Sequence, residues 1–403
     1  MLPLLKLVTP ITLAALLIAA QPASGKSETV LYNFGSQPGD GTDPSASLLL
    51  DSKGNFYGTT VGGGTGGGMG YGTVFKITPA GVETVLSSFG SKSGDGINPT
   101  SGLVKGKKGI LYGTTLSGGG SGCEGFGCGT VFMVTPRGKE TVLYSFGSQS
   151  GDGVNPQAGL VMDKEGNLYG TTYYGGAYGH DGGNGFGTVF KVTPAGVESV
   201  LYNFGSQSGD GTRPYAGLVM DKKGNLYGTT TSGGATNNGT VFEISTTGTE
   251  TVLYSFSPQY GDGDGWFPYG GLIMDAKGNL YGTTIGGVRH GGTVFKLTRD
   301  GKETVLYNFG SQSGDGLFPY DGLVMDRAGN LYGTDYEGGA NGVGTVFRIS
   351  PSGRETVLHS FGSQPGDGAF LYGALVMDKN GSLYGTTYQG GANGHGTLFK
   401  VTP

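Results

Sequence analysis

The chain of 403 residues contains 87 glycines and 17 prolines, and charged residues make up 14% of it with a formal net charge of −5. So much glycine with so little charge disfavours an ordinary helical enzyme, and the lack of a three-residue glycine period excludes collagen. The 23 tyrosines and 20 phenylalanines recur in short apolar runs, which disfavours a disordered chain.

The N-terminal 25 residues have the pattern of a secretory signal peptide. Lys6 ends a short basic region, residues 7–20 are almost entirely apolar, and Ala23-Ser24-Gly25 offers small residues for cleavage. The alternative is an uncleaved anchor, which is disfavoured because about 14 apolar residues are short for a bilayer span. We therefore expect residues 1–25 to be a signal peptide, residues 26–403 to form one domain, and the mature protein to be secreted or periplasmic.

A repeat of 52 to 58 residues runs through the rest of the chain. Its most regular mark is Glu-Thr-Val, or once Glu-Ser-Val, which begins at Glu28, Glu83, Glu140, Glu198, Glu250, Glu303 and Glu355. Each copy contains four short runs rich in Val, Tyr, Phe and Thr, as at residues 159–163, 167–172, 187–193 and 198–204. No run has helical spacing, so the pattern predicts an all-β protein.

Turn residues predict how these runs are connected. Asp163-Lys-Glu-Gly-Asn167 suits a tight hairpin between the first two runs, and Thr193-Pro-Ala-Gly196 suits one between the third and fourth. Longer Gly-rich segments make the other two connections. Each copy is thus predicted to be a four-stranded antiparallel meander.

Repeated four-stranded units are typical of a β-propeller, whereas a linear solenoid would need polar capping repeats. The chain instead begins with a lone fourth strand, residues 28–34, and ends with strands one to three of a last unit, residues 373–401. We therefore predict seven blades, closed into a ring when the N-terminal strand joins the C-terminal blade.

The repeated block also resembles a known family. Gly-Leu-Val-Met-Asp-x-x-Gly-Asn-Leu-Tyr-Gly-Thr-Thr, followed by Gly-Thr-Val-Phe-Lys and Glu-Thr-Val-Leu-Tyr-Asn-Phe-Gly, is similar to the GloVer-type tandem repeat of exported bacterial proteins, and its first half is similar to the NHL propeller repeat. The resemblance covers residues 28–403 and implies a secreted bacterial propeller. It implies no chemistry. Members often end in a surface-anchoring segment, which this chain lacks, so surface attachment is not expected.

The long loops between strands two and three and between blades are expected on one face, where binding residues usually gather. Acidic residues outnumber basic ones fourteen to three in these loops, and lysines fill the hairpins of the opposite face. Seven acids stand in a repeated Gly-Asp-Gly motif, in which each Asp either bonds its own loop amides or contributes to a calcium site. These residues are Asp40, Asp95, Asp152, Asp210, Asp262, Asp315 and Asp367.

Departures from the repeat give the candidate binding residues, since the fold needs only what the copies share. Aromatic faces beside carboxylates and amides suit sugar rings, and the alternative is drift in the loops. The candidates are Trp266, Phe267, Asp264, Tyr173, Tyr174, Tyr178, His180, Tyr336, Arg289, His290 and His395. The three histidines belong to different blades, so a zinc site is not expected from them.

Two pairs have specific interpretations. Asp335 and Glu337 lie two residues apart and are the candidates for an acid and base in hydrolysis or elimination. Cys123 and Cys128, the only cysteines, are expected to form a local disulfide in an exported protein.

The sequence thus predicts a monomeric binding or scaffold module that engages a glycan or protein through its acidic, Gly-rich face. The alternative is a hydrolase or lyase acting on polysaccharides. No cofactor is assigned apart from the calcium alternative, and no nucleic-acid partner or transmembrane segment after signal cleavage is expected.

Overall fold

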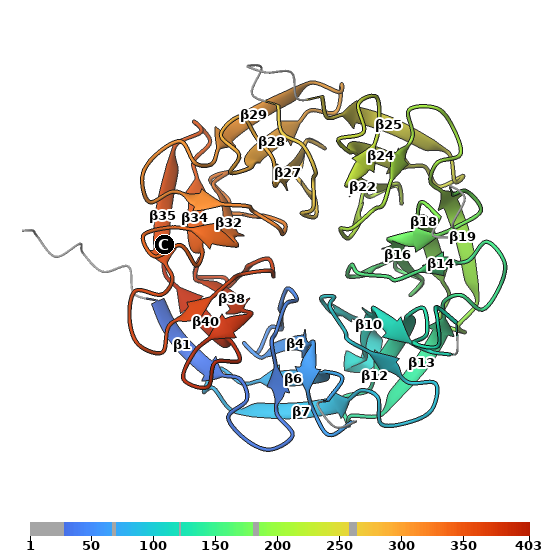
Figure 1. The fold of residues 1–403 in the computed structure, drawn as a ribbon, viewed down its shortest axis with the longest axis horizontal. Coiled ribbons are helices and arrows are strands. Elements are labelled where there is room, and N and C mark those ends of the chain that lie inside the picture. The colour runs from blue at the N-terminus through green and yellow to red at the C-terminus, as the bar shows by residue number, and fades with distance from the viewer. Residues whose placement is uncertain (1–27, 67–69, 121, 180–184, 258–263) are drawn as a thin grey trace, which may run out of the picture.

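The computed structural model describes residues 28–403 except 67–69, 121, 180–184 and 258–263. Seven four-stranded antiparallel sheets surround a central channel (Figure 1). The predicted all-β, seven-bladed propeller is confirmed. The expected signal peptide lies outside the described residues. Within those residues, no helix is long and apolar enough to cross a membrane.

Each blade is built from four strands in chain order, counted from the channel outward. Blade 1 consists of β3 (Leu49–Leu50), β4 (Phe56–Thr60), β6 (Thr73–Ile77) and β7 (Glu83–Ser88). Blade 2 consists of β9 (Val104–Lys105), β10 (Leu111–Thr115), β12 (Thr130–Val134) and β13 (Glu140–Ser145). Blade 3 consists of β15 (Val161–Met162), β16 (Leu168–Thr172), β18 (Thr188–Val192) and β19 (Glu198–Asn203), and blade 4 of β21 (Val219–Met220), β22 (Leu226–Thr230), β24 (Thr240–Ile244) and β25 (Glu250–Ser255). Blade 5 consists of β26 (Ile273–Met274), β27 (Leu280–Thr284), β28 (Thr293–Leu297) and β29 (Glu303–Asn308), and blade 6 of β31 (Val324–Met325), β32 (Leu331–Asp335), β34 (Thr345–Ile349) and β35 (Glu355–Ser360).

Blade 7 is completed by the N-terminus of the described chain, which closes the ring. It consists of β37 (Val376–Met377), β38 (Leu383–Thr387), β40 (Thr397–Val401) and β1 (Glu28–Asn33). β1 runs antiparallel to β40, from Glu28 opposite Val401 to Asn33 opposite Thr397. Phe34 follows β1, is completely buried, and packs with Phe75 of blade 1 at 5.1 Å between ring centroids.

The innermost strands are shorter than the sequence predicts, with two paired residues each. The segments before them bond to the neighbouring blade. Thr59 Oγ1, in the Gly-Thr-Thr motif of blade 1, donates to the carbonyl oxygen of Ser101 in blade 2 at 2.9 Å. The same bond recurs at all seven interfaces and is made by Thr59, Thr114, Thr171, Thr229, Thr283, Thr334 and Thr386.

Buried phenylalanines join the blades further out. A Phe that ends the outer strand of one blade packs edge-to-face on a Phe from the third strand of the next, as Phe89 does on Phe132 at 4.9 Å. Such pairs stabilise beyond the area they bury. The cores therefore lie between blades, and each blade depends on both of its neighbours.

Short β-ribbons hold the loops of one face, because each blade-to-blade segment pairs with the strand two to three loop of the blade it enters. The pairs are β2 (Gly41–Thr42) with β5 (Gly62–Gly63), β8 (Gly96–Ile97) with β11 (Ser117–Gly118), β14 (Gly153–Val154) with β17 (Tyr174–Gly175), β20 (Gly211–Thr212) with β23 (Ser232–Gly233), β30 (Gly316–Leu317) with β33 (Glu337–Gly338), and β36 (Gly368–Ala369) with β39 (Gln389–Gly390). We call the face that carries these ribbons the loop face.

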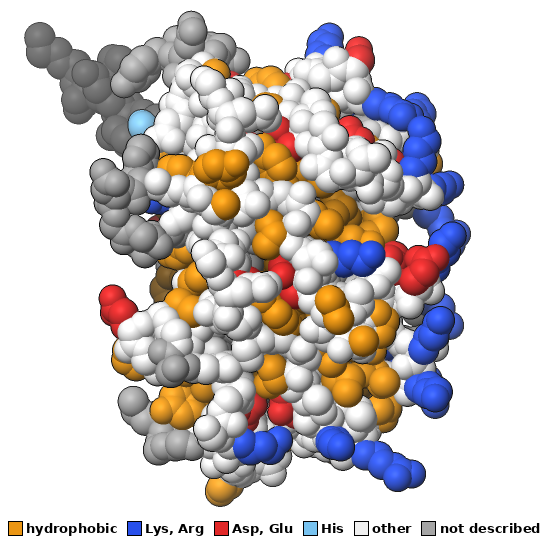
Figure 2. Space-filling view, turned by 90° about the vertical axis from the view of Figure 1, so that its right-hand side faces the viewer, with side chains coloured by type: hydrophobic (Ala, Val, Ile, Leu, Met, Phe, Trp, Pro, Cys, Tyr) orange, Lys and Arg blue, Asp and Glu red, His pale blue; other side chains and the backbone are white. Residues whose placement is uncertain are grey.

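Lys and Arg side chains gather along one edge of the molecule in side view (Figure 2).

Candidate functional site

A cavity of ≈ 390 Å³ occupies the central channel. It lies toward the loop face, since its wall is formed by the segments that directly follow the blade-to-blade loops. Its volume falls in the range of small-molecule sites. All seven blades contribute to the wall, which is lined by Ser45, Ala46, Ser47, Val61, Thr100, Ser101, Gly102, Gln157, Ala158, Gly159, Tyr215, Ala216, Gly217, Tyr269, Tyr320, Asp321, Tyr372 and Tyr388.

The two sides of this cavity differ in chemistry. One equivalent position in each copy, the residue after the loop proline (after Leu371 in the last copy), reaches the wall from every blade. Blades 1 to 3 place Ser45, Thr100 and Gln157 there, whereas blades 4 to 7 place Tyr215, Tyr269, Tyr320 and Tyr372. The cavity therefore has small polar groups on one side and four tyrosines on the other.

The tyrosine rings contact one another in an unbroken series, which we call the aromatic arc. Ring centroids lie 4.9 Å apart for Tyr215 and Tyr269, 5.7 Å for Tyr269 and Tyr320, and 5.9 Å for Tyr320 and Tyr372. Rings from the strand two to three loops extend the series, with Tyr173 at one end, Tyr388 at the other, and Tyr336 against Tyr320 and Tyr372. Edge-to-face contacts fix the orientation of such rings.

Burial makes these phenols weaker acids than an exposed tyrosine. Desolvation, with added repulsion from Asp321, raises the pKa of Tyr215 to about 12. Desolvation also raises the pKa values of Tyr269, Tyr320 and Tyr372. The hydroxyls of the arc are neutral donors and acceptors at neutral pH, as in any tyrosine, and the raised pKa extends this state to higher pH.

A second equivalent position, the residue before the loop proline (before Leu371 in the last copy), has left-handed backbone in every blade. The residues are Asp43, Asn98, Asn155, Arg213, Phe267, Phe318 and Phe370, with φ between 55° and 61°. Left-handed backbone costs a residue with a bulky side chain about 1–2 kcal/mol. Asp and Asn tolerate it, but blades 5 to 7 carry phenylalanine there, and the Phe370 ring lies 5.1 Å from Tyr336. The same φ in all seven blades shows that the turn of the repeat sets this backbone, and Phe370 places its ring beside the arc.

Asp321 is the one acidic residue among the described residues of the cavity wall. Its carboxylate accepts hydrogen bonds from Ser47 Oγ at 3.0 Å, from the Gly322 N–H at 2.6 Å and from the Ala374 N–H. Desolvation raises its pKa although these donors oppose the shift. Asp321 therefore connects blades 6, 7 and 1 across the closing seam of the ring.

Some of the predicted binding residues meet at this site. Tyr173, Tyr174 and Tyr336 belong to the aromatic arc or contact it. Trp266 and His290 form a separate pair with centroids 6.5 Å apart, on the loops of blade 5. The structure thus divides the candidates between the arc and a second place on the loop face.

The other candidates lie apart from the arc. Tyr178 is 47% exposed, Arg289 is exposed, and His395 Nδ1 lies 3.6 Å from Asp43 Oδ1. Asp264 is buried and accepts from the Tyr254 hydroxyl and the Ser257 N–H. His180 lies outside the described residues.

The Gly-Asp-Gly carboxylates are directed into the protein. In blade 4, Asp210 Oδ2 accepts hydrogen bonds from the Ser206 N–H at 3.1 Å and the Tyr202 hydroxyl at 2.8 Å. The described members of the motif are 4–8% exposed. Asp262 lies outside the described residues, and Asp264 makes the corresponding contacts there. Calcium binding by these loops stays a prediction.

Burial also corrects the expected charge of the loop face. Eight of its fourteen acids are buried, namely Asp40, Asp95, Asp152, Asp210, Asp264, Asp315, Asp335 and Asp367. The cause is that backbone amides of the blade-to-blade loops bond seven of these carboxylates, whereas Thr345 Oγ1 bonds Asp335. The face therefore presents far less acid to solvent than the sequence count implies.

Asp335 and Glu337 lie in different surroundings, and a catalytic role for the pair stays a prediction. Asp335 replaces the second Thr of the Gly-Thr-Thr motif and is completely buried. It accepts a hydrogen bond from Thr345 Oγ1 at 2.6 Å, where the other blades pair two threonines, and its Oδ1 is buried without a partner. Desolvation raises its pKa strongly. Glu337 begins β33 and is half-buried.

Replacing Asp335 by Thr is expected to stabilise the protein at neutral pH by about 1–3 kcal/mol, because an unsatisfied buried carboxyl oxygen is removed and the threonine pair of the other blades is restored. Chemical unfolding of Asp335→Thr would measure this. The reverse change in blade 3, Thr172→Asp, is the matched control and should destabilise. A destabilised Asp335→Thr protein would contradict the interpretation.

The two cysteines are joined in the structure. Cys123 and Cys128 form a disulfide with an S–S distance of 2.07 Å in the strand two to three loop of blade 2. It closes a small loop away from the cavity, so its role is local.

Sequence reasoning missed most of the cavity wall. Tyr215, Tyr269, Tyr320, Tyr372 and Asp321 were not candidates for binding, although a signal existed. The residue after the loop proline changes from Ser, Thr or Gln to Tyr between the third and fourth copies. Such a change at one equivalent position indicates that one side of the channel differs in chemistry from the other.

Comparisons with solved structures show the same fold in proteins of low sequence identity. The chain is similar to a streptogramin B lyase structure, with 13% identity, a TM-score of 0.61, and coverage of 93% of this chain and 97% of that one. It is also similar to the extracellular domain of a B. thetaiotaomicron protein described as a hybrid two component system, with 15% identity, a TM-score of 0.56, and coverage of 93% of this chain and 41% of that one.

A puromycin hydrolase structure matches with 12% identity and a TM-score of 0.53, over 85% of this chain and 50% of that one. This chain thus spans half or less of the length of two of the three structures. At such identities the likeness concerns the fold alone. No curated protein matches the sequence.

The family comparison is specific where the fold comparison is not. The model of the Gloeobacter/Verrucomicrobia repeat matches residues 17–181, 67–284, 179–324 and 259–403, which together span every blade. The resemblance seen in the repeated block is therefore confirmed, and the chain belongs to the Gloeobacter/Verrucomicrobia repeat family.

Proposed function

We propose that this protein is an exported binding module that holds a sugar of a glycan chain in the channel cavity. The observation that carries the proposal is the division of the cavity between the aromatic arc and the polar side chains of blades 1 to 3. A sugar ring has the same division, because its C–H face stacks on aromatic rings while its hydroxyls form hydrogen bonds. Export is supported by the signal-like sequence of residues 1–25.

The dimensions of the cavity also support a small carbohydrate unit. A volume of ≈ 390 Å³ is near the lower end for ligand sites, so it suits one or two sugar units with the rest of the chain outside the mouth. Ser45, Thr100 and Gln157 supply hydroxyl and amide groups opposite the tyrosines.

Binding without turnover fits the site better than hydrolysis does. A carboxylate pair that cleaves glycosidic bonds needs two acids roughly 5–10 Å apart that face the substrate. In the described wall the acid is Asp321, already bonded to Ser47, Gly322 and Ala374. This arrangement favours the binding module over the hydrolase or lyase.

A glycan array followed by calorimetry tests the proposal. We expect Tyr269→Ala to weaken binding of the best array ligand at least tenfold, since stacking on one ring is lost and the arc is interrupted. Tyr178→Ala is the matched control, because Tyr178 is exposed on a loop of blade 3 outside the arc, and it should bind as the wild type does. Equal affinities of all three proteins, or an array without carbohydrate ligands, would contradict the proposal. Release of reducing sugar from a bound ligand would favour the hydrolase.

A further inference from the structure

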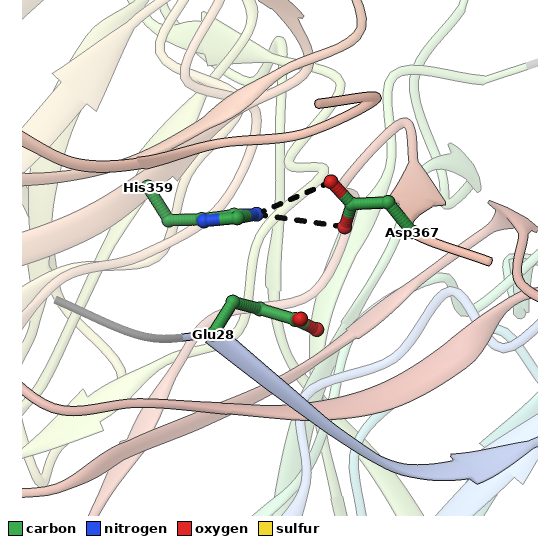
Figure 3. A group of neighbouring side chains, drawn as sticks. All are labelled: Glu28, His359 and Asp367. Carbon is green, nitrogen blue, oxygen red and sulfur yellow. Dashed lines mark hydrogen bonds and ion pairs between the residues drawn. The ribbon is translucent and has the colours of Figure 1, made fainter. Parts of the chain in front are cut away.

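We propose that Glu28, His359 and Asp367 form a binding site for one divalent transition-metal ion of the Zn²⁺ type at the seam where the ring closes. Glu28 begins β1, His359 lies in β35, and Asp367 precedes β36. The three side chains point toward one another (Figure 3). Among the described residues they are the one group of three or more His, Cys, Asp or Glu whose ligand atoms all lie within 4.8 Å of one another.

His359 is a departure from the repeat at a position whose role is otherwise clear. Five copies carry tyrosine there, and each hydroxyl donates to the carboxylate of the following Gly-Asp-Gly loop or its equivalent at 2.7–3.1 Å. The tyrosines are Tyr32, Tyr144, Tyr202, Tyr254 and Tyr307. His359 Nε2 instead lies 3.5 Å from Asp367 Oδ1 and 3.4 Å from Oδ2. An imidazole nitrogen, which can bind a metal ion, thus replaces a protonated phenol, which is a poor metal ligand.

Of the two carboxylates beside His359, that of Glu28 lacks a full set of donors. Glu28 Oε1 is buried without a hydrogen-bond partner. Desolvation, together with repulsion from the Asp367 carboxylate, raises the pKa of Glu28 to about 7. Two acids that face each other in a buried place are stabilised by a shared proton or a shared cation. His359 adds an imidazole nitrogen to the two carboxylates, and the three groups together make a set of ligands for a shared metal cation.

The donor set selects the class of ion. One imidazole and two carboxylates suit borderline first-row ions such as Zn²⁺, whereas Ca²⁺ and Mg²⁺ prefer oxygen alone. Asp367 is also held for this task, since its carboxylate accepts from the Ser363 N–H at 3.0 Å and the Gly368 N–H at 2.9 Å. Outer contacts of this kind orient metal ligands. The side chains of Asp367 and His359 are 1% and 10% exposed, so only a small movement is open to them.

The position of the site gives it a consequence for the fold. Glu28 belongs to the strand that closes blade 7, whereas His359 belongs to the outer strand of blade 6. An ion held by both would tie the N-terminal strand to the preceding blade and stabilise the closed ring by mass action.

The experiment measures Zn²⁺ binding by calorimetry on the metal-free mature chain, residues 26–403. We expect one Zn²⁺ per chain and a higher melting temperature with Zn²⁺ than with Mg²⁺. His359→Tyr should fold, because it restores the side chain of five other copies, and should bind Zn²⁺ at least tenfold more weakly. Glu28→Gln is a second variant with the same expected loss.

The repeat also offers a gain of binding. Tyr307→His should create a second Zn²⁺ site from Asp315 and Glu355, which occupy the equivalent positions in blades 5 and 6. Visible absorption after loading with Co²⁺ would report the added nitrogen ligand. Wild type that binds no Zn²⁺, or wild type and both loss variants that bind it with equal affinity, would overturn the proposal.

Discussion

Removal of residues 28–35 is expected to destabilise the protein by at least about 5 kcal/mol, the largest effect of any change considered. The deletion uncovers the edge of β40 and removes Phe34, which is completely buried. Truncation of a buried phenylalanine alone costs about 3–5 kcal/mol. The lost pairing from Glu28 to Asn33 adds to this.

Two controls separate loss of β1 from shortening of the chain. A protein that begins at residue 28 keeps β1 and should melt at the temperature of the longer protein. A synthetic peptide of residues 28–35 added to the deleted protein should restore part of the lost stability. An unchanged melting temperature after the deletion would show that the ring does not depend on β1.

Stability is expected to fall by about 5 kcal/mol as the pH rises from 5 to 8, which is the second large effect. At six of the seven interfaces, the described residues place the first Glu of an outer strand beside the buried Asp of the preceding Gly-Asp-Gly loop. Desolvation, followed by repulsion from that Asp, raises the pKa of the glutamates to about 7 at most interfaces. These residues are Glu28, Glu83, Glu198, Glu250 and Glu355.

The direction follows from proton linkage. A glutamate with a folded pKa of about 7 and an ordinary pKa near 4.5 holds its proton in the folded state while the unfolded state has lost it. The stabilisation is therefore complete at low pH and disappears as the pH rises through about 7. After allowance for solvent screening, each pair contributes on the order of 1 kcal/mol.

The acid side of the profile is set by other residues. Hairpin aspartates such as Asp163 and Asp275 accept hydrogen bonds from backbone and Asn groups, which outweigh desolvation and lower their pKa. Their contribution is present above pH 4 and is lost as the pH falls further, so maximum stability is expected near pH 5. Chemical unfolding across pH 3–8 measures the profile.

A single interface provides the control for the pH prediction. Glu198→Gln removes the charge that Asp152 repels, so it should stabilise the protein at pH 8 and leave stability at pH 5 nearly unchanged. Stability that rises from pH 5 to 8 in the wild type would contradict the assignment of raised pKa values.

The sequence predicted the fold well because the fold depends on what the copies share. Glu-Thr-Val repeats, hairpin residues such as Asp163 and Asn167, and the unequal chain ends were sufficient for blade number and closure. The bonds that Thr171 and its equivalents make across blades were not predicted, because such bonds leave no trace in local periodicity.

The site was predicted only in part, because residues that lie far apart in the sequence meet around the channel only when the ring closes. Tyr336 and Tyr173 stood out as local departures, but Tyr215 and Tyr269 matter through their alignment around the channel. Asp335 was a candidate acid or base in the sequence and is buried, since the loop ribbon of β30 and β33 covers it. Likewise His359 becomes informative only when β1 brings Glu28 beside it.

The sugar site proposed for the channel cavity is tested most directly by a crystal structure of the protein with the glycan that binds best on the array. We predict a sugar ring in the channel cavity, with one face against Tyr215, Tyr269 or Tyr320 and hydroxyls toward the side of Ser45 and Gln157. Ordered sugar elsewhere on the loop face, with an empty channel, would contradict it.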